Sequence, residues 1–321
     1  MKVIGIDIGT NYTKATDGEK LLIFPSVVAF AEEKEWSLKE ETKSVYIGDE
    51  ALAAMKANET IELWRPIKDG RIVHESFLEL AKFAISKIGK PDLIATGLPV
   101  KSSKKEREEL KTKLETETKA KVLVFPEPVG TLVSMGIETG VCLDIGFGTT
   151  DIAVIADMEF LKGDTMLTGV DSLYSALEVT VRSKTGINLS PEEITNLLVN
   201  EVSVGRIRSG KKIVVKKEDI NKEYETAMKN WVEKIVARVN STLEGLSTTL
   251  LDNFVATGGG ILLPGVFEAL KGKFAEFDIK KPENPIASNV SGFYKLGVML
   301  SEKKSEEKEK VEEEKVRKRK T

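Results

Sequence analysis

The sequence contains a single cysteine and a single histidine in 321 residues. Because Cys142 and His74 stand alone, a disulfide framework, a zinc site with Cys and His ligands and a Cys-His nucleophile pair are excluded. An iron-sulfur cluster held by several cysteines is excluded for the same reason. We expect Cys142 to be a buried core thiol and His74 to lie at a helix entry or on the surface.

Long apolar runs and a dominant sign of charge are also missing. No apolar run approaches the ~18 residues of a membrane-spanning helix, and the start of the chain lacks the charged, apolar and small-residue regions of a signal peptide. We therefore expect a cytoplasmic protein without a membrane partner. The formal net charge is -3, with acidic and basic residues interspersed, so no direct nucleic-acid partner is predicted.

Length and composition favour two domains. A chain of 321 residues is longer than a domain with a single hydrophobic core usually is. Its composition, 41% hydrophobic and 31% charged residues, is typical of globular proteins. The expected parts are a first domain at 1–140 with a small appendage at about 31–62, a second domain at 141–290, a return helix at 291–300 that packs on the first domain, and a charged tail at 301–321. The tail has only Val311 and Val316 as apolar residues, so we expect it to be disordered or a solvated helix.

The pattern along the chain alternates between strands and helices. Residues 2–8 and 21–30 are rich in β-branched and apolar residues, and Asp17-Gly18 is typical of a hairpin turn, so these runs are predicted to be neighbouring antiparallel strands. Helices are predicted in "HESFLELAKFAISKIG", "KEREELKTKLETETK", "EPVGTLVSMG", "GVDSLYSALEVTVRSKTG" and "KEYETAMKNWVEKIVARVNSTLEGL". From Val141 the order of strand, glycine turn and strand starts again, which predicts an internally duplicated α/β fold.

Two loops share an Asp-Ile-Gly core after a strand-like run: "GIDIGTNYTK" at 5–14 and "LDIGFGTTD" at 143–151. A glycine after a strand permits a turn whose N–H groups form an anion nest, and nearby hydroxyls add donors. Bare carboxylates would repel phosphate. A divalent cation resolves this conflict, because Mg²⁺ keeps waters that the acids can hold while it bridges phosphate oxygens. Two such loops, one from each domain, would clamp a triphosphate.

Two further glycine motifs are weaker. "GRIRSGKK" at 205–212 matches the start of a P-loop pattern, but Lys212 stands where a Ser or Thr should meet Mg²⁺, and a strand-like run follows. We expect a basic hairpin there. "GGGILLPG", between a strand and a helix, indicates close approach of the backbone to a flat ring or a phosphate.

These motifs resemble the superfamily of actin, Hsp70 and sugar kinases, and within it the actin-like ATPases. "IDIGTNYTK" and "LDIGFGTTD" are similar to the two phosphate loops, "FPEPVG" and "ASNVSGFYKLGV" to the two connecting segments, and "VATGGGILLPGV" to the adenosine motif. Shorter matches, "FPSVV", "YIGDEA" and "RPIKDGRI", resemble actin and the bacterial shape-determining actin homologue. The resemblance covers about residues 1–300 in family order, with a length close to archaeal and plasmid-segregation actins.

The resemblance implies a duplicated actin-like (ribonuclease H-like) fold with a cleft between two domains for ATP and Mg²⁺, with GTP left open as an alternative. Asp7 and Asp144 would hold Mg²⁺ through water, and Glu127 would orient the attacking water, where actin has glutamine and Hsp70 relatives have glutamate followed by proline. The residues implied to contact phosphate or adenosine are Gly9, Thr10, Asn11, Lys14, Gly146, Gly148, Thr149, Gly258, Gly259, Gly260 and, poorly anchored by motif, Glu201.

Two functions remain open within the resemblance. One is an ATP hydrolase that polymerises into cytoskeletal filaments, with itself as partner; the other is a non-polymerising ATPase that acts as an adaptor or a chaperone-like switch. "YIGDEA" and "RPIKDGRI" favour the filament. An Hsp70 would carry a substrate-binding domain after the ATPase, and here only the charged tail follows. We expect that tail to be the place where a cargo or adaptor attaches, if one does.

Overall fold

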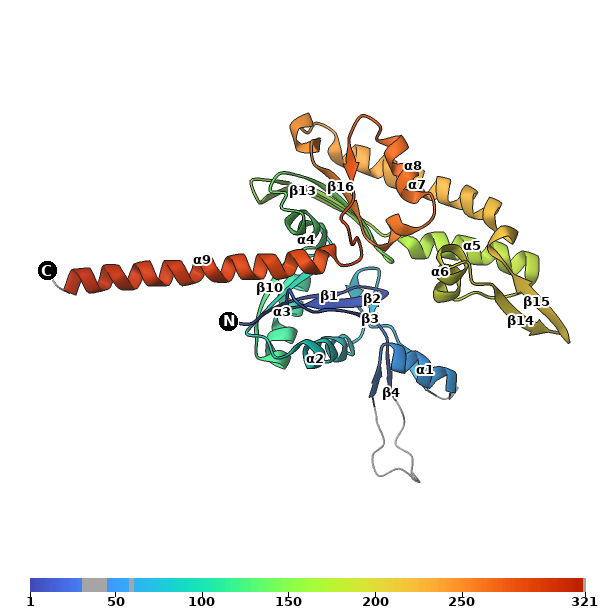
Figure 1. Cartoon of the computed structure of the whole chain (residues 1–321), viewed down its shortest axis with the longest axis horizontal. Helices are drawn as coiled ribbons and strands as arrows, with labels where there is room; N and C mark the ends of the chain where they lie inside the picture. The colour runs from blue at the N-terminus through green and yellow to red at the C-terminus, as the bar shows by residue number, and fades with distance from the viewer. Residues whose placement is uncertain (31–44, 58–60, 320–321) are drawn as a thin grey trace, which may run out of the picture. The chain divides into compact units, whose positions relative to one another are not determined.

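The computed structural model describes residues 1–30, 45–57 and 61–319, with side chains as far as residue 303. The chain divides into two compact units (Figure 1). Unit 1 comprises Met1–Leu98, Ser102–Gly136 and Ala287–Thr321, and unit 2 comprises Pro99–Lys101 and Ile137–Ile286. Part of the expected appendage at 31–62 lies outside the described residues. No helix in the described ranges is both long and apolar enough to cross a bilayer.

Unit 1 is built on a five-stranded sheet in the order β10-β9-β1-β2-β3. Its strands are β1 (Val3–Ile8), β2 (Tyr12–Thr16), β3 (Leu21–Pro25), β9 (Leu93–Leu98) and β10 (Lys121–Pro126). β1, β9 and β10 are parallel, while β1, β2 and β3 form antiparallel pairs. Parallel strands need covering helices, and the apolar faces of α2 (Phe77–Ile88) and α3 (Lys104–Thr118) share one core with the sheet.

The predicted pairing of residues 2–8 with 21–30 is wrong. β2 lies between β1 and β3, so the run at 2–8 pairs with 12–16 and not with 21–25. The segment "YTKAT" contains strand-favouring residues, Tyr12, Thr13 and Thr16, but it is short and has no apolar run, so the apolar runs on either side of it are more conspicuous in the sequence. Residues 21–30 are also divided, because Pro25 ends β3 and β4 (Val28–Phe30) joins another sheet.

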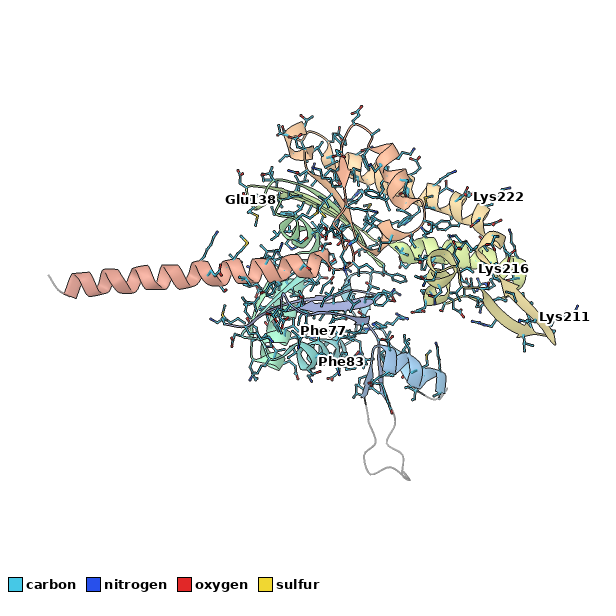
Figure 2. All side chains as sticks on the ribbon, in the orientation of Figure 1. Phe77, Phe83, Glu138, Lys211, Lys216 and Lys222 are labelled. Atoms are coloured by element: carbon cyan, nitrogen blue, oxygen red, sulfur yellow. The ribbon has the colours of Figure 1, made fainter. Side chains whose placement is uncertain are left out.

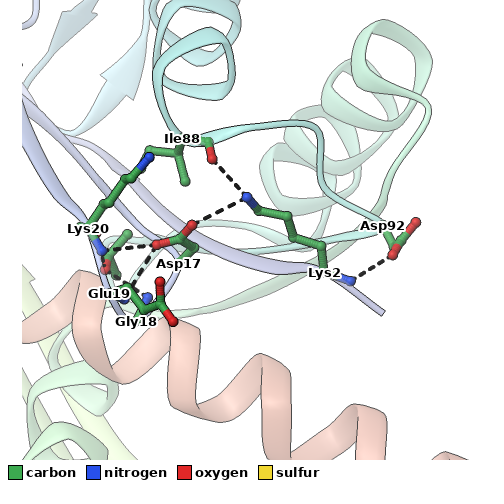
Figure 3. Close-up of polar contacts among 8 residues, drawn as sticks. Lys2, Asp17, Gly18, Glu19, Lys20, Ile88 and Asp92 are labelled. Atoms are coloured by element: carbon green, nitrogen blue, oxygen red, sulfur yellow. Dashed lines mark hydrogen bonds and ion pairs between the residues drawn. The ribbon is translucent and has the colours of Figure 1, made fainter.

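The predicted Asp17-Gly18 turn is confirmed, and it joins β2 to β3 (Figure 3). Gly18 has φ +91°, a conformation that glycine adopts without strain. The Asp17 carboxylate accepts a hydrogen bond from the Lys20 N–H at 3.0 Å, which is the main reason why the pKa of Asp17 is lowered. The Lys2 ammonium lies 3.3 Å from Asp17 and donates to the carbonyl of Ile88 at 2.8 Å, so the turn is tied to the end of α2.

A small appendage follows β3. It contains a three-stranded sheet in the order β5-β4-β6 and one helix. Its remaining elements are β5 (Val45–Ile47), α1 (Asp49–Ala57) and β6 (Glu62–Trp64), followed by the short hairpin of β7 (Ile67–Lys68) and β8 (Arg71–Ile72). Residues 45–57, which contain the "YIGDEA" match, form a strand, a turn and a helix.

Unit 2 is built on a second five-stranded sheet, in the order β13-β12-β11-β16-β17. Its strands are β11 (Gly140–Ile145), β12 (Thr150–Ala156), β13 (Glu159–Met166), β16 (Phe254–Thr257) and β17 (Ile279–Lys280). Read from β3 and from β13, the two sheets have the same order and the same parallel and antiparallel pairs. The predicted internal duplication is therefore confirmed.

Helices and a hairpin complete unit 2. The helices are α5 (Val170–Thr185), α6 (Pro191–Val199), α7 (Asn221–Leu243) and α8 (Val266–Lys273). α7 has one apolar face, which is buried in the core at Met228, Trp231, Ile235, Val239 and Leu243. The predicted basic hairpin is confirmed as β14 (Val204–Arg208) and β15 (Lys211–Val215), with Lys211 labelled on it and Lys216 just after it in Figure 2.

Each of the two sheets is followed along the chain by one helix, and these two helices pack together in unit 1. α4 (Glu127–Ser134) follows β10, and α9 (Ser288–Arg319) follows β17. A Cβ added to Gly292 would lie 1.7 Å from the carbonyl oxygen of Gly130, so only glycine permits this close crossing. The Thr131 hydroxyl donates to Asn289 Oδ1 at 2.7 Å beside the crossing. The predicted return helix at 291–300 lies within α9.

Candidate nucleotide site

The first Asp-Ile-Gly loop joins β1 to β2. The Gly9 N–H donates to the carbonyl of Tyr12 at 3.2 Å, which closes a tight turn over Thr10 and Asn11. Register pairs Asp7 with Lys14, and the Lys14 ammonium lies 3.0 Å from Asp7 Oδ2. Asp7 is buried, with 6% of its surface exposed, so this ion pair compensates for burial of its charge. The structure therefore brings Asp7, Lys14 and the glycine turn together.

Glu127 lies at the same edge of the unit 1 sheet as Asp7. The register of β1 on β9 pairs Ile6 with Thr96, and that of β9 on β10 pairs Gly97 with Phe125. The carboxyl ends of these parallel strands therefore lie side by side. Glu127 is the first residue of α4 and is half-buried, and a Cβ on Gly97 would lie 3.0 Å from Glu127 Cγ.

The second Asp-Ile-Gly loop joins β11 to β12 in unit 2. Here the Gly146 N–H donates to the carbonyl of Thr149 at 2.9 Å, as Gly9 does in the first loop. The first turn of α5 supports the loop, because the Val170 N–H donates to the Gly146 carbonyl at 3.1 Å. A Cβ on Gly169 would lie 2.1 Å from the carbonyl oxygen of Phe147, so the helix start is pressed against the loop. Gly146, Gly148 and Thr149 are thus held in one short turn.

The triple glycine at 258–260 begins directly beside Asp144. Thr257, the last residue of β16, pairs with Asp144 of β11. Gly258 has φ +87°, and a Cβ there would lie 2.4 Å from Asp144 Oδ1. Gly260 packs on Ile145, whereas a Cβ on Gly259 would meet nothing within 4 Å. The backbone at Gly259 therefore has open space in front of it, next to a carboxylate that is 6% exposed.

Glu201 lies just beyond the end of α6. It has φ +56° and is exposed, and its carboxylate lies 2.8 Å from the Lys217 ammonium. This hydrogen bond with Lys217 lowers the pKa of Glu201. A contact between Glu201 and a nucleotide stays a prediction.

Asp151 is a site residue that sequence reasoning missed, although it ends the second loop motif. It faces Asp144 across the β11–β12 pair and is 1% exposed. Its Oδ1 accepts hydrogen bonds from the Thr165 hydroxyl at 2.5 Å and the Val100 N–H at 2.8 Å. Burial raises the pKa of Asp151 to about 6 in spite of these donors, and Asp164 adds to the rise. The signal in the sequence was an acid inside an otherwise apolar strand.

The raised pKa gives a prediction for stability. Because the pKa of Asp151 is about 6 in the folded chain and its ordinary value is 3.8, its contribution to stability is full below about pH 4 and is lost as the pH rises through about 6. Asp151→Asn keeps an oxygen acceptor and removes the buried charge. We expect this variant to be more stable than wild type at pH 8 by on the order of 2 kcal/mol, with the gain shrinking as the pH falls through the range between the two pKa values.

Thermal or urea unfolding at pH 5 and pH 8 measures this difference. Asp252→Asn, at an exposed position of the same unit, serves as the control and should behave like wild type at both pH values. An equal change in stability for Asp151→Asn at the two pH values would contradict the charged state assigned to Asp151.

Comparisons with known proteins agree with this geometry. Residues 5–130 match the family of N-terminal domains of actin-like proteins, and residues 142–268 match the family of C-terminal domains of archaeal MreB-like actin homologues. The two matches fall one in each half of the duplicated fold, and each begins beside one of the two Asp-Ile-Gly loops. The chain belongs to the actin-like proteins, with a second domain of the archaeal MreB-like kind.

Solved structures show the same fold. MreB5 of Spiroplasma citri bound to AMPPNP has a TM-score of 0.77 at 20% identity, with 95% of this chain and 98% of that chain covered. The same protein bound to ADP has a TM-score of 0.76 at 20% identity, covering 94% and 98%. A MamK double helical filament has a TM-score of 0.76 at 18% identity, covering 92% and 98%. No curated protein matches the chain.

Proposed function

We propose that the protein is an actin-like ATPase that binds Mg-ATP with its two Asp-Ile-Gly loops, hydrolyses it, and polymerises according to the nucleotide bound. The observation that carries the proposal is the duplication of the loop: Asp7 and Asp144 occupy equivalent places at the carboxyl ends of the first strands of two sheets of the same order. An ordinary glycine hairpin explains either loop alone, but not two matching loops with a buried carboxylate in each.

The residues present fit a hydrated Mg²⁺ ion. The described part of the chain has no group of three or more His, Cys, Asp or Glu side chains that could hold a metal directly, which suits an ion held through water. Gly258 passes so close to Asp144 that a Cβ there would lie 2.4 Å from Asp144 Oδ1, so the glycine backbone packs against this carboxylate. Asp7 and Asp144 would hold the waters, and Mg²⁺ would neutralise charge on the phosphate oxygens.

We propose that the bound base is adenine. Two of the similar structures contain AMPPNP or ADP, and the backbone at Gly259 has open space in front of it. We propose that Gly258, Gly259 and Gly260 lie against the adenosine, and that Lys14, Thr10, Asn11 and the 146–149 turn contact the phosphates. GTP stays an alternative, which competition between the two nucleotides would decide.

Glu127 is proposed to activate the water that attacks the terminal phosphate. It follows β10 at the edge where Asp7 also lies. A carboxylate there can accept a proton from water as well as orient it, which the glutamine of actin cannot do.

Filament formation is proposed for two reasons. One of the similar structures is a double helical filament. In addition, if the phosphates contact both units, triphosphate favours one arrangement and hydrolysis releases it, so that a head-to-tail contact can depend on the nucleotide. Such a contact does not close on itself and grows into a filament. We propose the appendage from Tyr46 to Ala54 as a contact surface and the cytoplasm as the location.

The first test is polymerisation itself. Light scattering with Mg-ATP across a concentration series should show a critical concentration. Deleting 301–321 should preserve both ATPase activity and polymerisation, because these residues lie outside the family resemblance. Reversing the charges of Asp49 and Glu50 should weaken polymerisation without weakening nucleotide binding. A strictly monomeric protein at every concentration and temperature would leave the monomeric adaptor ATPase as the better proposal.

A further inference from the structure

Three residues of the chain leave unit 1 and return to it. Leu98 ends β9 and Ser102 begins the approach to α3, both in unit 1, while Pro99–Lys101 between them pack with unit 2. We call Pro99–Lys101 the crossover segment. Its backbone is held by side chains of β12 and β13: the Val100 N–H donates to Asp151 Oδ1 at 2.8 Å, and the Lys101 N–H donates to the Thr165 hydroxyl at 2.9 Å.

β13 provides both space and an ion-pair partner for the crossover segment. A Cβ on Gly163 would lie 2.8 Å from Val100 Cγ1, so the glycine leaves room for the valine. Asp164 lies 3.7 Å from the Lys101 ammonium and is also paired with Arg238 of α7. The segment is therefore held by two backbone hydrogen bonds, one apolar contact and one ion pair.

Asp151 contacts both the crossover segment and the second Asp-Ile-Gly loop. Besides the Val100 N–H and the Thr165 hydroxyl, the side chain of Thr149 lies near this carboxylate and opposes the rise of its pKa, and Thr149 is the last residue of the Gly146 turn. The carboxylate is buried, so water does not replace a donor that turns away, and loss of one donor alters the strength of the others.

We propose that Asp151 is a positioning residue that connects Thr149 of the second loop to the crossover segment, so that a phosphate on the loop changes how firmly Val100 and Lys101 are held. The holding of the crossover segment by Asp151 in the protein without nucleotide follows from the contacts described above. Its response to phosphate rests on the proposed nucleotide site.

Hydrogen exchange measured by mass spectrometry on the peptide that covers residues 98–103 tests whether Asp151 holds the crossover segment in the full chain without nucleotide. Asp151→Ala should speed exchange in this peptide by roughly 10- to 100-fold, as expected for loss of a hydrogen bond to a charged acceptor. Asp151→Asn keeps an acceptor and should stay close to wild type. Thr165→Val, which is nearly isosteric, should speed exchange at Lys101 if the alanine variant fails to fold.

Thr242→Val is the matched control, because Thr242 is another buried threonine of unit 2 whose hydroxyl bonds to a helix carbonyl. It should leave exchange in the peptide unchanged. If the 98–103 peptide exchanged at the wild-type rate in both Asp151→Ala and Thr165→Val, the proposal that these side chains hold the crossover segment would be wrong.

Adding Mg-AMPPNP tests the connection. Exchange in the 98–103 peptide should change by several-fold in wild type and in Asp151→Asn, and should not change in Asp151→Ala that still binds the nucleotide by calorimetry. An equal response in Asp151→Ala would overturn the connection. If wild type bound no nucleotide, the proposed function and the response to phosphate would both fail, while exchange in the empty protein would still decide whether Asp151 holds the crossover segment.

Discussion

Replacing Glu127 by alanine is expected to slow ATP hydrolysis by roughly 10²- to 10⁴-fold, the range for loss of a positioned general base. Nucleotide binding should persist, because Glu127 is one residue at the start of α4 and the hydrogen bonds that close the glycine turns and the ion pair of Lys14 do not involve it. Phosphate release under single-turnover conditions measures the chemical step, and calorimetry with Mg-AMPPNP measures binding.

Two variants sharpen this test. Glu127→Gln keeps the shape and the hydrogen-bonding oxygen but cannot accept the proton, so an intermediate rate would separate orientation of the water from proton transfer. Glu138→Gln removes an exposed glutamate (labelled in Figure 2) and should hydrolyse ATP like wild type. Equal loss of binding and turnover in Glu127→Ala would assign Glu127 to structure instead of chemistry.

Replacing Asp144 by alanine is expected to weaken Mg-AMPPNP binding by roughly 10- to 100-fold, the usual cost of removing a group that orients the ligands of a metal ion. Asp144 is buried beside Gly258 and directly precedes the turn of the second loop. The loss should be largest with Mg²⁺ present and small with EDTA, because without the cation the carboxylate only repels phosphate.

Asp144→Asn retains the shape beside Gly258 and tests whether charge or volume matters. Asp252→Ala, at an exposed position in the same unit, is the control and should bind like wild type. If Asp144→Ala bound Mg-AMPPNP as tightly as wild type, the proposed role of the second loop would be wrong.

Much of the fold followed from local patterns. Helix α3 could be predicted because Ser103 and Glu106 form a reciprocal cap at its start, and α2 because Gly89 ends it. The duplication could be predicted because the same Asp-Ile-Gly turn follows a strand-like run twice. The signals for these features are residues close to one another in the sequence, so they can be recognised without knowing which segments pack together.

The remaining features depend on contacts between distant segments. Strand β2 became recognisable only when it was paired on both sides, since "YTKAT" is short and has no apolar run that marks it in the sequence. Lys14 was expected at a phosphate, and register across the hairpin places it against Asp7 as well. The sequence by itself determined which residues line two matched loops. Tertiary structure alone decided that α9 packs on α4 through Gly130 and Gly292, and that Asp151 is buried where it holds Val100, because burial and desolvation arise only when the sheets are assembled.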